Sequence, residues 1–296
     1  MISRINILVW NVRGISRKDS QRYLHKLCVD NHIRLLVLIE LMTDASQLLS
    51  ICRMLHFSKG CSVLEGTMWV LWQDELVAQL REVGDQLANM EISWGGFTFL
   101  FSAVYAKCTR VGRRELWKAM ESIHGINEGP WMVAGDFNVI LNAQERSVGA
   151  PPNLRNMEEF NDAIFNCGLA EVDFDGSAIT WTNGVLWQRL DRALSNAAWS
   201  ELFSTTTVSH LMPGRSDHAP LLIKSGYPRH GSPAFRYLNV WKRYPNFLSV
   251  VQQAWHGSVN AGGMVGFHRK LVNLKPILWQ WSWQVFCNIF QAVKKA

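Results

Sequence analysis

Eight polar side chains stand beside apolar runs of the sequence, and together they could carry acid–base and metal chemistry. A carboxylate directly after a buried apolar run is costly unless it has a partner. Taken singly, each residue also fits an ordinary polar strand end, so a catalytic site requires that all eight lie close together in the folded chain. The set comprises Asn11 after "ILVW", Glu40 after "LLVLI", Tyr105 after "FLFSAV", Asp136 and Asn138 in "GDFN", Asp191 in "RLDRAL", and Asp217 and His218 before "APLLI".

This combination of residue types fits phosphodiester hydrolysis. A divalent cation held by one or two carboxylates neutralises charge on the phosphate and on the leaving oxygen. A histidine beside a carboxylate can accept or hold a proton near neutral pH. Amides and a phenol can orient phosphate oxygens or the attacking water. Oxygen donors favour Mg²⁺, with Mn²⁺ as an alternative, over Zn²⁺, which prefers closely spaced His and Cys.

The elements that must position these residues alternate between strands and helices. The largely apolar runs 5–10 and 34–40 predict buried strands, and the helical spacing over 20–32 predicts a helix between them. Four closely spaced runs between 67 and 106 predict antiparallel meanders. Helices are expected at 113–124 and 156–167, around a strand that begins at 131. The pattern predicts an α+β fold, with two mostly antiparallel sheets packed face to face and helices on the outer faces.

A turn signal lies in "TWTNGVLW". Asn183-Gly184 between β-favouring residues predicts a type I′ hairpin, which needs positive φ at both turn positions. Trp181 and Trp187 flank this turn. Such a hairpin could probe a DNA groove, and the alternative is that both tryptophans only pack against a sheet.

The charge distribution divides the chain. All 24 acidic residues lie at or before Asp217, whereas the sequence from Lys224 onward carries ten Lys and Arg and no acid. We therefore expect one domain at 1–224 and a basic, tryptophan-containing, partly helical extension at 225–296, in which Pro276 interrupts the helical spacing. A basic, aromatic tail suits a polyanion such as DNA. The alternative is an apolar extension that has lost its partner.

Cellular location is constrained by what the sequence lacks. The six cysteines are scattered without a C-x-x-C pair, which is typical of reduced thiols in an intracellular protein. The first residues show no signal peptide, and no apolar run reaches the ~20 residues of a membrane span. We expect a nuclear or cytoplasmic protein with no membrane partner.

The stretches "LVWNVRG", "LLVLIE", "VYA", "VAGDFNVIL", "RLDRAL" and "GRSDHAPL" occur in this order over residues 5–223. In this, the sequence resembles the endonuclease/exonuclease/phosphatase superfamily, whose DNase I-like fold is a four-layer α/β/β/α sandwich. It is most similar to the apurinic-like endonuclease domain of plant non-LTR retroelement polyproteins. The later "FRYLNVWKRYPNF" resembles the connector from such a domain to a reverse transcriptase, a partner absent from this chain.

The resemblance implies a role for each matching residue. It implies that Glu40 is the main metal ligand, with Asn11 beside it and Asp217 near the metal. The catalytic group would be His218, held by Asp191. The remaining roles are a water-activating or phosphate-gripping pair, Asp136 and Asn138, and a phosphate-contacting phenol, Tyr105; candidate DNA contacts are Arg13, Trp181, Trp187 and Arg215.

These roles predict a Mg²⁺-dependent DNA endonuclease that nicks one strand. The same fold serves RNA, nucleotide and inositol phosphate phosphoesterases, which remain an alternative, as does a catalytically inert retroelement relic. Relatives that act on abasic sites often follow the metal-binding Glu with Thr and Lys, whereas Leu41 and Met42 follow Glu40 here. This difference argues against a repair substrate more than against hydrolysis.

Overall fold

The computed structural model describes residues 4–149, 151–203, 205–226, 241, 244–257 and 263–293. The chain forms two compact units, Met1–Pro233 and Ala234–Ala296, and each is described by itself. Among the described helices, none is long and apolar enough to cross a membrane.

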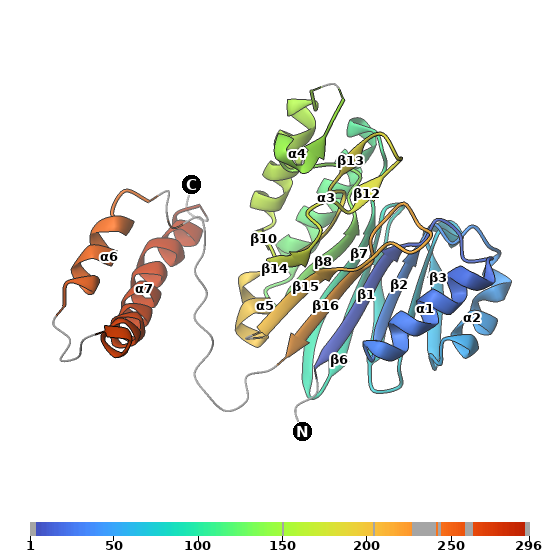
Figure 1. Ribbon diagram of the computed structural model, residues 1–296, viewed down its shortest axis with the longest axis horizontal. Helices are drawn as coiled ribbons and strands as arrows, with labels where there is room; N and C mark the ends of the chain where they lie inside the picture. The colour runs from blue at the N-terminus through green and yellow to red at the C-terminus, as the bar shows by residue number, and fades with distance from the viewer. Residues whose placement is uncertain are drawn as a thin grey trace. The chain divides into compact units, whose positions relative to one another are not determined.

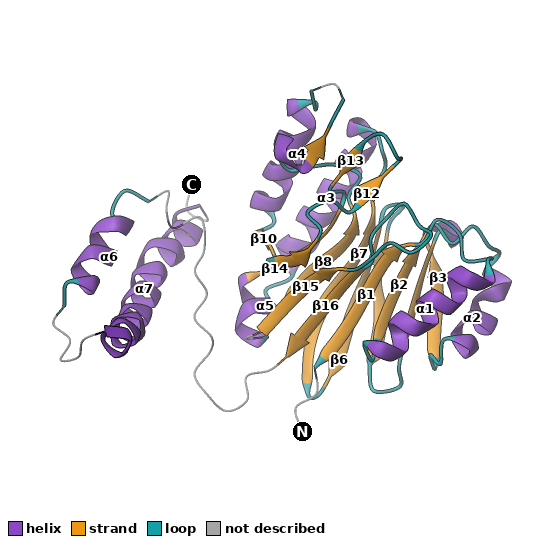
Figure 2. Cartoon of the chain, viewed as in Figure 1, coloured by secondary structure: helices purple, strands orange, loops and turns teal. Residues whose placement is uncertain are grey.

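The larger unit is built on two main sheets (Figures 1 and 2). The first sheet has the strand order β11-β15-β16-β1-β2-β4-β3. Its strands are β1 (Ile5–Asn11), β2 (Leu35–Ile39), β3 (Lys59–Val63), β4 (Met68–Trp72), β11 (Phe174–Gly176), β15 (Thr205–His210) and β16 (Leu221–Gly226). The pairs β1–β2 and β11–β15 are parallel, and the others are antiparallel.

The second sheet has the order β10-β14-β8-β7-β6-β5, and only the pair β7–β8 is parallel. Its strands are β5 (Val77–Val83), β6 (Leu87–Trp94), β7 (Phe97–Tyr105), β8 (Trp131–Asp136), β10 (Leu169–Glu171) and β14 (Asp191–Asn196). A small third sheet joins β12 (Trp181–Thr182), β13 (Trp187–Gln188) and β9 (Arg146–Ser147).

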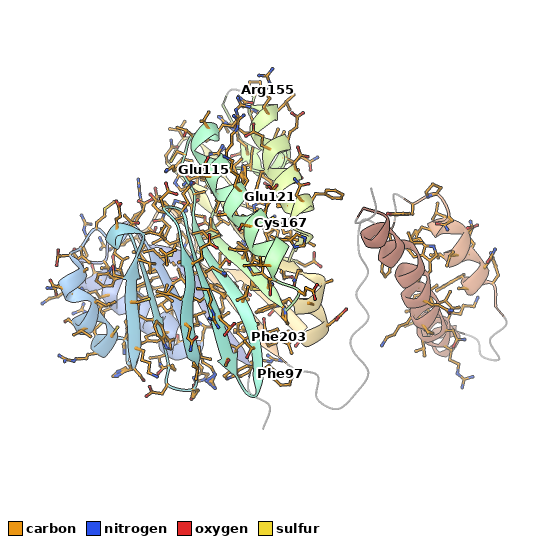
Figure 3. The ribbon with its side chains drawn as sticks, turned by 180° about the vertical axis from the view of Figure 1, so that it is seen from behind. Phe97, Glu115, Glu121, Arg155, Cys167 and Phe203 are labelled. Atoms are coloured by element: carbon orange, nitrogen blue, oxygen red, sulfur yellow. The ribbon has the colours of Figure 1, made fainter. Side chains whose placement is uncertain are left out.

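Helices cover the outer face of each main sheet, as seen from both sides in Figures 1 and 3. The first sheet carries α1 (Lys18–Asp30) and α2 (Leu48–Met54), and the second carries α3 (Arg110–Ile126) and α4 (Leu154–Asn166). A short helix, α5 (Ala197–Leu202), follows β14, and single 3₁₀ turns lie at Ala45–Gln47, Leu64–Gly66 and Ala143–Glu145. The predicted α+β, four-layer α/β/β/α sandwich of mostly antiparallel sheets is confirmed.

Strand alternation explains the layering. In β1, Ile7 and Val9 face the core between the two sheets, whereas Leu8 and Trp10 pack with α1 on the outer face. Because successive side chains point to opposite faces, a strand covered on both sides is apolar throughout. The inner core includes Phe101 of β7, so the two sheets are held together by apolar contact.

The four closely spaced runs form antiparallel strands of two different sheets: β4 pairs with β2 and β3 in the first sheet, whereas β5, β6 and β7 form a meander in the second. The hairpin prediction was wrong. The Asn183-Gly184 hairpin has a four-residue loop in which Gly184 has positive φ and Asn183 does not. The Asn183 side chain instead accepts hydrogen bonds from the backbone N–H groups of Val185 and Leu186, which stabilises the longer loop.

The described residues of the smaller unit form the helices α6 (Phe247–Trp255) and α7 (Gly263–Val293). The expected interruption at Pro276 is wrong, because α7 continues through this proline. The lost backbone hydrogen bond is offset by packing just beyond it, where Leu278 and Trp281 join a core cluster with Trp241 and Phe247. The segment "FRYLNVW" lies largely outside the described residues.

Candidate active site

The strand directions bring all eight candidate residues to one end of the two main sheets. Asn11 ends β1, and Glu40 follows its parallel neighbour β2. Tyr105 and Asp136 end the parallel pair β7 and β8, where they face each other in register. Asp191 instead begins β14, but β14 is antiparallel to β8, so Asp191 pairs directly with Asp136.

His218 joins the second-sheet carboxylates from the loop before β16. Its Nδ1 lies 2.9 Å from Oδ2 of Asp191, and its Nε2 lies 3.7 Å from Oδ2 of Asp136. Burial lowers the pKa of His218, but the charge and hydrogen bond of Asp191, together with the charges of Asp136 and Asp217, outweigh burial and raise the pKa to about 9. The imidazole is therefore protonated at neutral pH and is fixed in orientation by Asp191.

Asp136 is the most deeply buried carboxylate of the site, with 1% of its surface exposed. Burial and the nearby charge of Asp191 raise its pKa to about 7, against the opposing effect of His218. Its Oδ1 accepts a hydrogen bond from the backbone N–H of Asn138 at 2.9 Å, and its Oδ2 accepts one from Nδ2 of Asn11 at 3.2 Å. A carboxyl group with this pKa can take up a proton near neutral pH.

Glu40 forms a second cluster that touches the first. Its Oε1 accepts hydrogen bonds from Asn11 Nδ2 and from the Tyr105 hydroxyl, both at 2.9 Å, and its Oε2 lies 2.7 Å from Arg13 NH1. Burial raises the pKa of Glu40, but these three donors outweigh it, and the net shift is downward. Because Asn11 Nδ2 donates to both Glu40 and Asp136, the two clusters are adjacent.

Asp217 completes the Glu40 cluster. Its Oδ2 accepts a hydrogen bond from Trp181 Nε1 at 3.1 Å, and its Oδ1 lies 3.4 Å from Arg13 Nε. That Oδ1 is buried and has no hydrogen-bond donor among the described residues. Trp181 thus supports a site carboxylate, whereas Trp187 is 44% exposed on the hairpin. Arg215 lies away from the carboxylates, in an ion pair with Asp19.

The donor chemistry of the Glu40 cluster fits a hard divalent cation. Carboxylate oxygens of Glu40 and Asp217 and the amide oxygen of Asn11 are the oxygen ligands that Mg²⁺ and Mn²⁺ prefer. Oδ1 of Asp217 accepts no hydrogen bond from the described residues, and its ion-pair partner there is Arg13 at 3.4 Å, so it can serve as a ligand for such an ion. A different trio, Asp136, Asp191 and His218, also offers ligand atoms within 4.8 Å of one another. In that trio the imidazole is already held by Asp191, so we favour the Glu40 cluster.

Several supporting residues lie inside the motifs but were not singled out from the sequence. Ser216 donates to the carbonyl of Asn11 and accepts from the backbone N–H of His218. The Thr180 hydroxyl accepts from the backbone N–H of Asp191, and Trp10 Nε1 donates to the carbonyl of His218. In the sequence, these roles are indicated only by the presence of a hydroxyl or indole residue inside the motifs "GRSDH", "ITWT" and "LVWN".

Asn138 is held in the left-handed region, with φ of 50°. Its Nδ2 donates to the carbonyl of Ala106 at 2.7 Å, and its own carbonyl accepts from the buried guanidinium of Arg113 at 3.0 Å. This fixes the backbone turn that brings the Asn138 N–H to Asp136.

Comparisons with known proteins concern the family and the fold. The family model described as endonuclease/exonuclease/phosphatase family matches residues 8–218. No curated protein matches the sequence significantly. Among solved structures, the endonuclease domain of TRAS1, a telomere-specific non-LTR retrotransposon, is 11% identical, with a TM-score of 0.59 over 75% of this chain and 98% of that one.

Two further structures share the fold. The AP endonuclease LMAP of Leishmania major is 13% identical, with a TM-score of 0.58 over 76% of this chain and 88% of that one. The 3′-5′ exonuclease NExo of Neisseria meningitidis is 17% identical, with a TM-score of 0.58 over 75% and 100%. At such identities the likeness establishes the fold alone. The family match spans most of the larger unit and every candidate residue, and the chain therefore belongs to the endonuclease/exonuclease/phosphatase family.

Proposed function

We propose that the chain is a Mg²⁺-dependent phosphodiesterase that nicks one strand of DNA. The observation that carries the proposal is the amide of Asn11, which donates to both Glu40 and Asp136. This hydrogen bonding places an oxygen-donor cluster suited to a cation next to a carboxyl–imidazole–carboxylate cluster suited to proton transfer. Both promote hydrolysis of an anionic ester, the cation by neutralising charge and the proton-transfer groups by activating water.

The cation site would be formed by Glu40, Asp217 and Asn11, and the bound ion would supply charge neutralisation at the phosphate. Asp136, with its pKa of about 7, is the candidate base that takes a proton from the attacking water. His218, protonated at neutral pH and held by Asp191, donates a hydrogen bond to the phosphate oxygen as negative charge develops there.

Asn138 and Tyr105 then serve as orienting groups. The hydroxyl of Tyr105 donates to Glu40, and burial together with the Glu40 charge raises its pKa. It therefore stays protonated and can act as a donor beside the cation. The Asn138 amide contacts Asp136 at 3.5 Å and can help to orient a water bound to that carboxylate.

DNA is the proposed substrate because several structural neighbours are described as nucleases and because the sequence carries a basic extension. The exposed Trp187 and the guanidinium groups of Arg13 and Arg215 are the proposed contacts to the strand. A phosphoesterase acting on RNA, nucleotides or inositol phosphates is the competing function of this fold. The extension from residue 225 is proposed to connect to a reverse transcriptase, and we propose a nuclear or cytoplasmic location.

The test is nicking of supercoiled plasmid by the full chain with Mg²⁺, beside phosphate release from an inositol phosphate. Glu40→Gln and His218→Gln should each reduce nicking by roughly a hundredfold or more. Glu75→Gln is the matched control, because Glu75 forms an exposed ion pair with Arg34 outside the site. Nicking that survives equally in Glu40→Gln and Glu75→Gln would remove the cation-site assignment. Phosphate release without nicking would favour the competing function.

A further inference from the structure

Arg13 occupies a fixed place in the loop after β1. Its backbone is in the left-handed region, with φ of 47°, and its N–H donates to Oδ1 of Asn11 at 3.3 Å. The next residue, Gly14, donates its N–H to the carbonyl of Glu40 at 2.8 Å. A non-glycine residue in this region costs free energy that the surrounding contacts must offset. The loop therefore delivers the Arg13 side chain to the Glu40 carboxylate.

The guanidinium of Arg13 spans two of the candidate cation ligands. NH1 lies 2.7 Å from Glu40 Oε2, and Nε lies 3.4 Å from Asp217 Oδ1. The latter oxygen is the buried acceptor that lacks a hydrogen-bond donor among the described residues. The guanidinium thus places one positive charge where a divalent cation would place two.

The Arg13 side chain is free to leave this place. Its exposed fraction is 47%, so solvent reaches the side chain and it can exchange the carboxylates for another anionic partner. A bound Mg²⁺ or Mn²⁺ would attract the same oxygens more strongly and would repel the guanidinium, since like charges at contact distance are unfavourable. A guanidinium released beside the cation would have a phosphate oxygen as its natural partner, because its planar fork matches phosphate geometry.

We propose that Arg13 is an internal counterion that competes with the divalent cation for Glu40 and Asp217 and transfers to a substrate phosphate when the cation binds. This proposal rests on the proposed function, because it takes the Glu40 cluster as the cation site. It predicts the opposite change in cation affinity from the change expected if Arg13 only supported the site. A residue that only orders Glu40 would help the cation to bind, whereas a competing counterion weakens cation binding.

The experiment measures Mn²⁺ affinity of the DNA-free full chain from the free-ion EPR signal. Arg13→Gln should bind Mn²⁺ about three- to tenfold more tightly than the parent chain, the size expected for losing a half-exposed ion pair to a second cation. Arg81→Gln is the matched control. It removes an arginine of β5 that is 50% exposed and paired with Glu91 of β6, and it should leave the Kd for Mn²⁺ unchanged. Equal or weaker binding in Arg13→Gln overturns the proposal.

Substrate kinetics and thermal stability test the proposed transfer of Arg13 to a substrate phosphate. Arg13→Gln should raise KM for duplex DNA severalfold at saturating Mn²⁺, and its melting temperature should rise more than that of the parent chain when Mn²⁺ is added. Unchanged KM would overturn the transfer to phosphate.

Glu40→Gln separates this proposal from the proposed function. If Glu40→Gln binds Mn²⁺ as well as the parent chain, the cation site is wrong. If Glu40→Gln loses the ion but Arg13→Gln binds it no more tightly than the parent chain, only the counterion role is wrong.

Discussion

Arg192→Met would test how the loop after Asp136 is held in place. Arg192 lies in β14 with 0% of its side chain exposed, and it is in register with Gly135. Its NH2 lies 2.5 Å from Glu145 Oε2, and its NH1 lies 2.6 Å from Glu171 Oε1. Glu145 Oε2 also accepts a hydrogen bond from the N–H of Leu141 at 2.7 Å, so Arg192 anchors the segment that follows Asn138.

The expected magnitude follows from burial. Removing one partner of a buried ion pair costs about 3–5 kcal/mol, because the other charge is left uncompensated. Glu145 is only 10% exposed, but Arg189 remains 3.5 Å from it, so we expect the lower end, about 3 kcal/mol. At roughly 2–4 °C per kcal/mol for a unit of this size, the melting temperature should fall by about 6–12 °C.

The assay is thermal unfolding followed by circular dichroism, with kcat for DNA nicking as the functional readout. Loosening the loop should lower kcat by roughly ten- to a hundredfold, since small misplacements of reacting groups are costly. Glu145→Gln added to Arg192→Met removes the orphaned charge and keeps an acceptor for Leu141, and it should restore about half of the lost stability. Arg110→Met, which breaks a more exposed pair with Glu159, is the control and should cost no more than about 1 kcal/mol. A melting temperature within 2 °C of the parent for Arg192→Met would refute this reasoning.

Three other predictions follow from single contacts. Asp191→Asn should lower kcat by roughly 10²–10⁴ and lower the pKa of His218, measurable by NMR titration of the imidazole in EDTA, because the charge that opposes burial is lost. Burial lowers the pKa of His210, whose Nδ1 donates to the Ser177 carbonyl. The contribution of neutral His210 to the free energy of unfolding is complete above pH 6.5. It is lost as the pH falls from 6.5 through the folded-state pKa, because the unfolded chain binds the proton more readily. Urea unfolding of His210→Gln should show a smaller loss of stability than the parent between pH 6.5 and 5. Gly135 has φ of 151°, and a Cβ there would lie 2.0 Å from the Val104 carbonyl oxygen, so Gly135→Ala should lower the free energy of unfolding by about 3 kcal/mol in the same assay.

The layers of the fold could be predicted because burial leaves a direct mark on sequence. The strand β2 is apolar throughout and β1 is apolar except at Asn6 and Asn11, and the helix between them follows helical spacing, so their order and layering could be predicted from residue types. Residue types do not indicate to which of the two sheets a strand belongs. The strand β4 resembles β6 and β7 in composition, yet it pairs with β2 and β3, because that choice depends on the chain crossing between sheets after Trp72.

In the candidate site, too, some features could be predicted from the sequence and others could not. A carboxylate after an apolar run, as at Glu40 and Asp136, is visible in sequence because its burial needs a partner. The partners themselves are set by register and loop geometry. Asp191 begins its strand rather than ending it, and only its antiparallel pairing with β8 places it opposite Asp136. Arg13 lies beside Glu40 through a left-handed turn that residue types alone do not specify.

The two halves of the site come from different sheets, and this explains why the apolar core matters to the chemistry. The first sheet and its loops supply Asn11, Glu40 and the His218 segment, and the second supplies Asp136 and Tyr105. Among the described residues, polar contacts join the halves of the site between Asn11 and Asp136, between Tyr105 and Glu40, and between His218 and the acids Asp136 and Asp191. Hydrogen bonds of this kind tolerate displacements of only a few tenths of an ångström. The packing of β1 and β2 against β7 and β8 must therefore fix the separation of the sheets before the acids, the amide and the imidazole can act together.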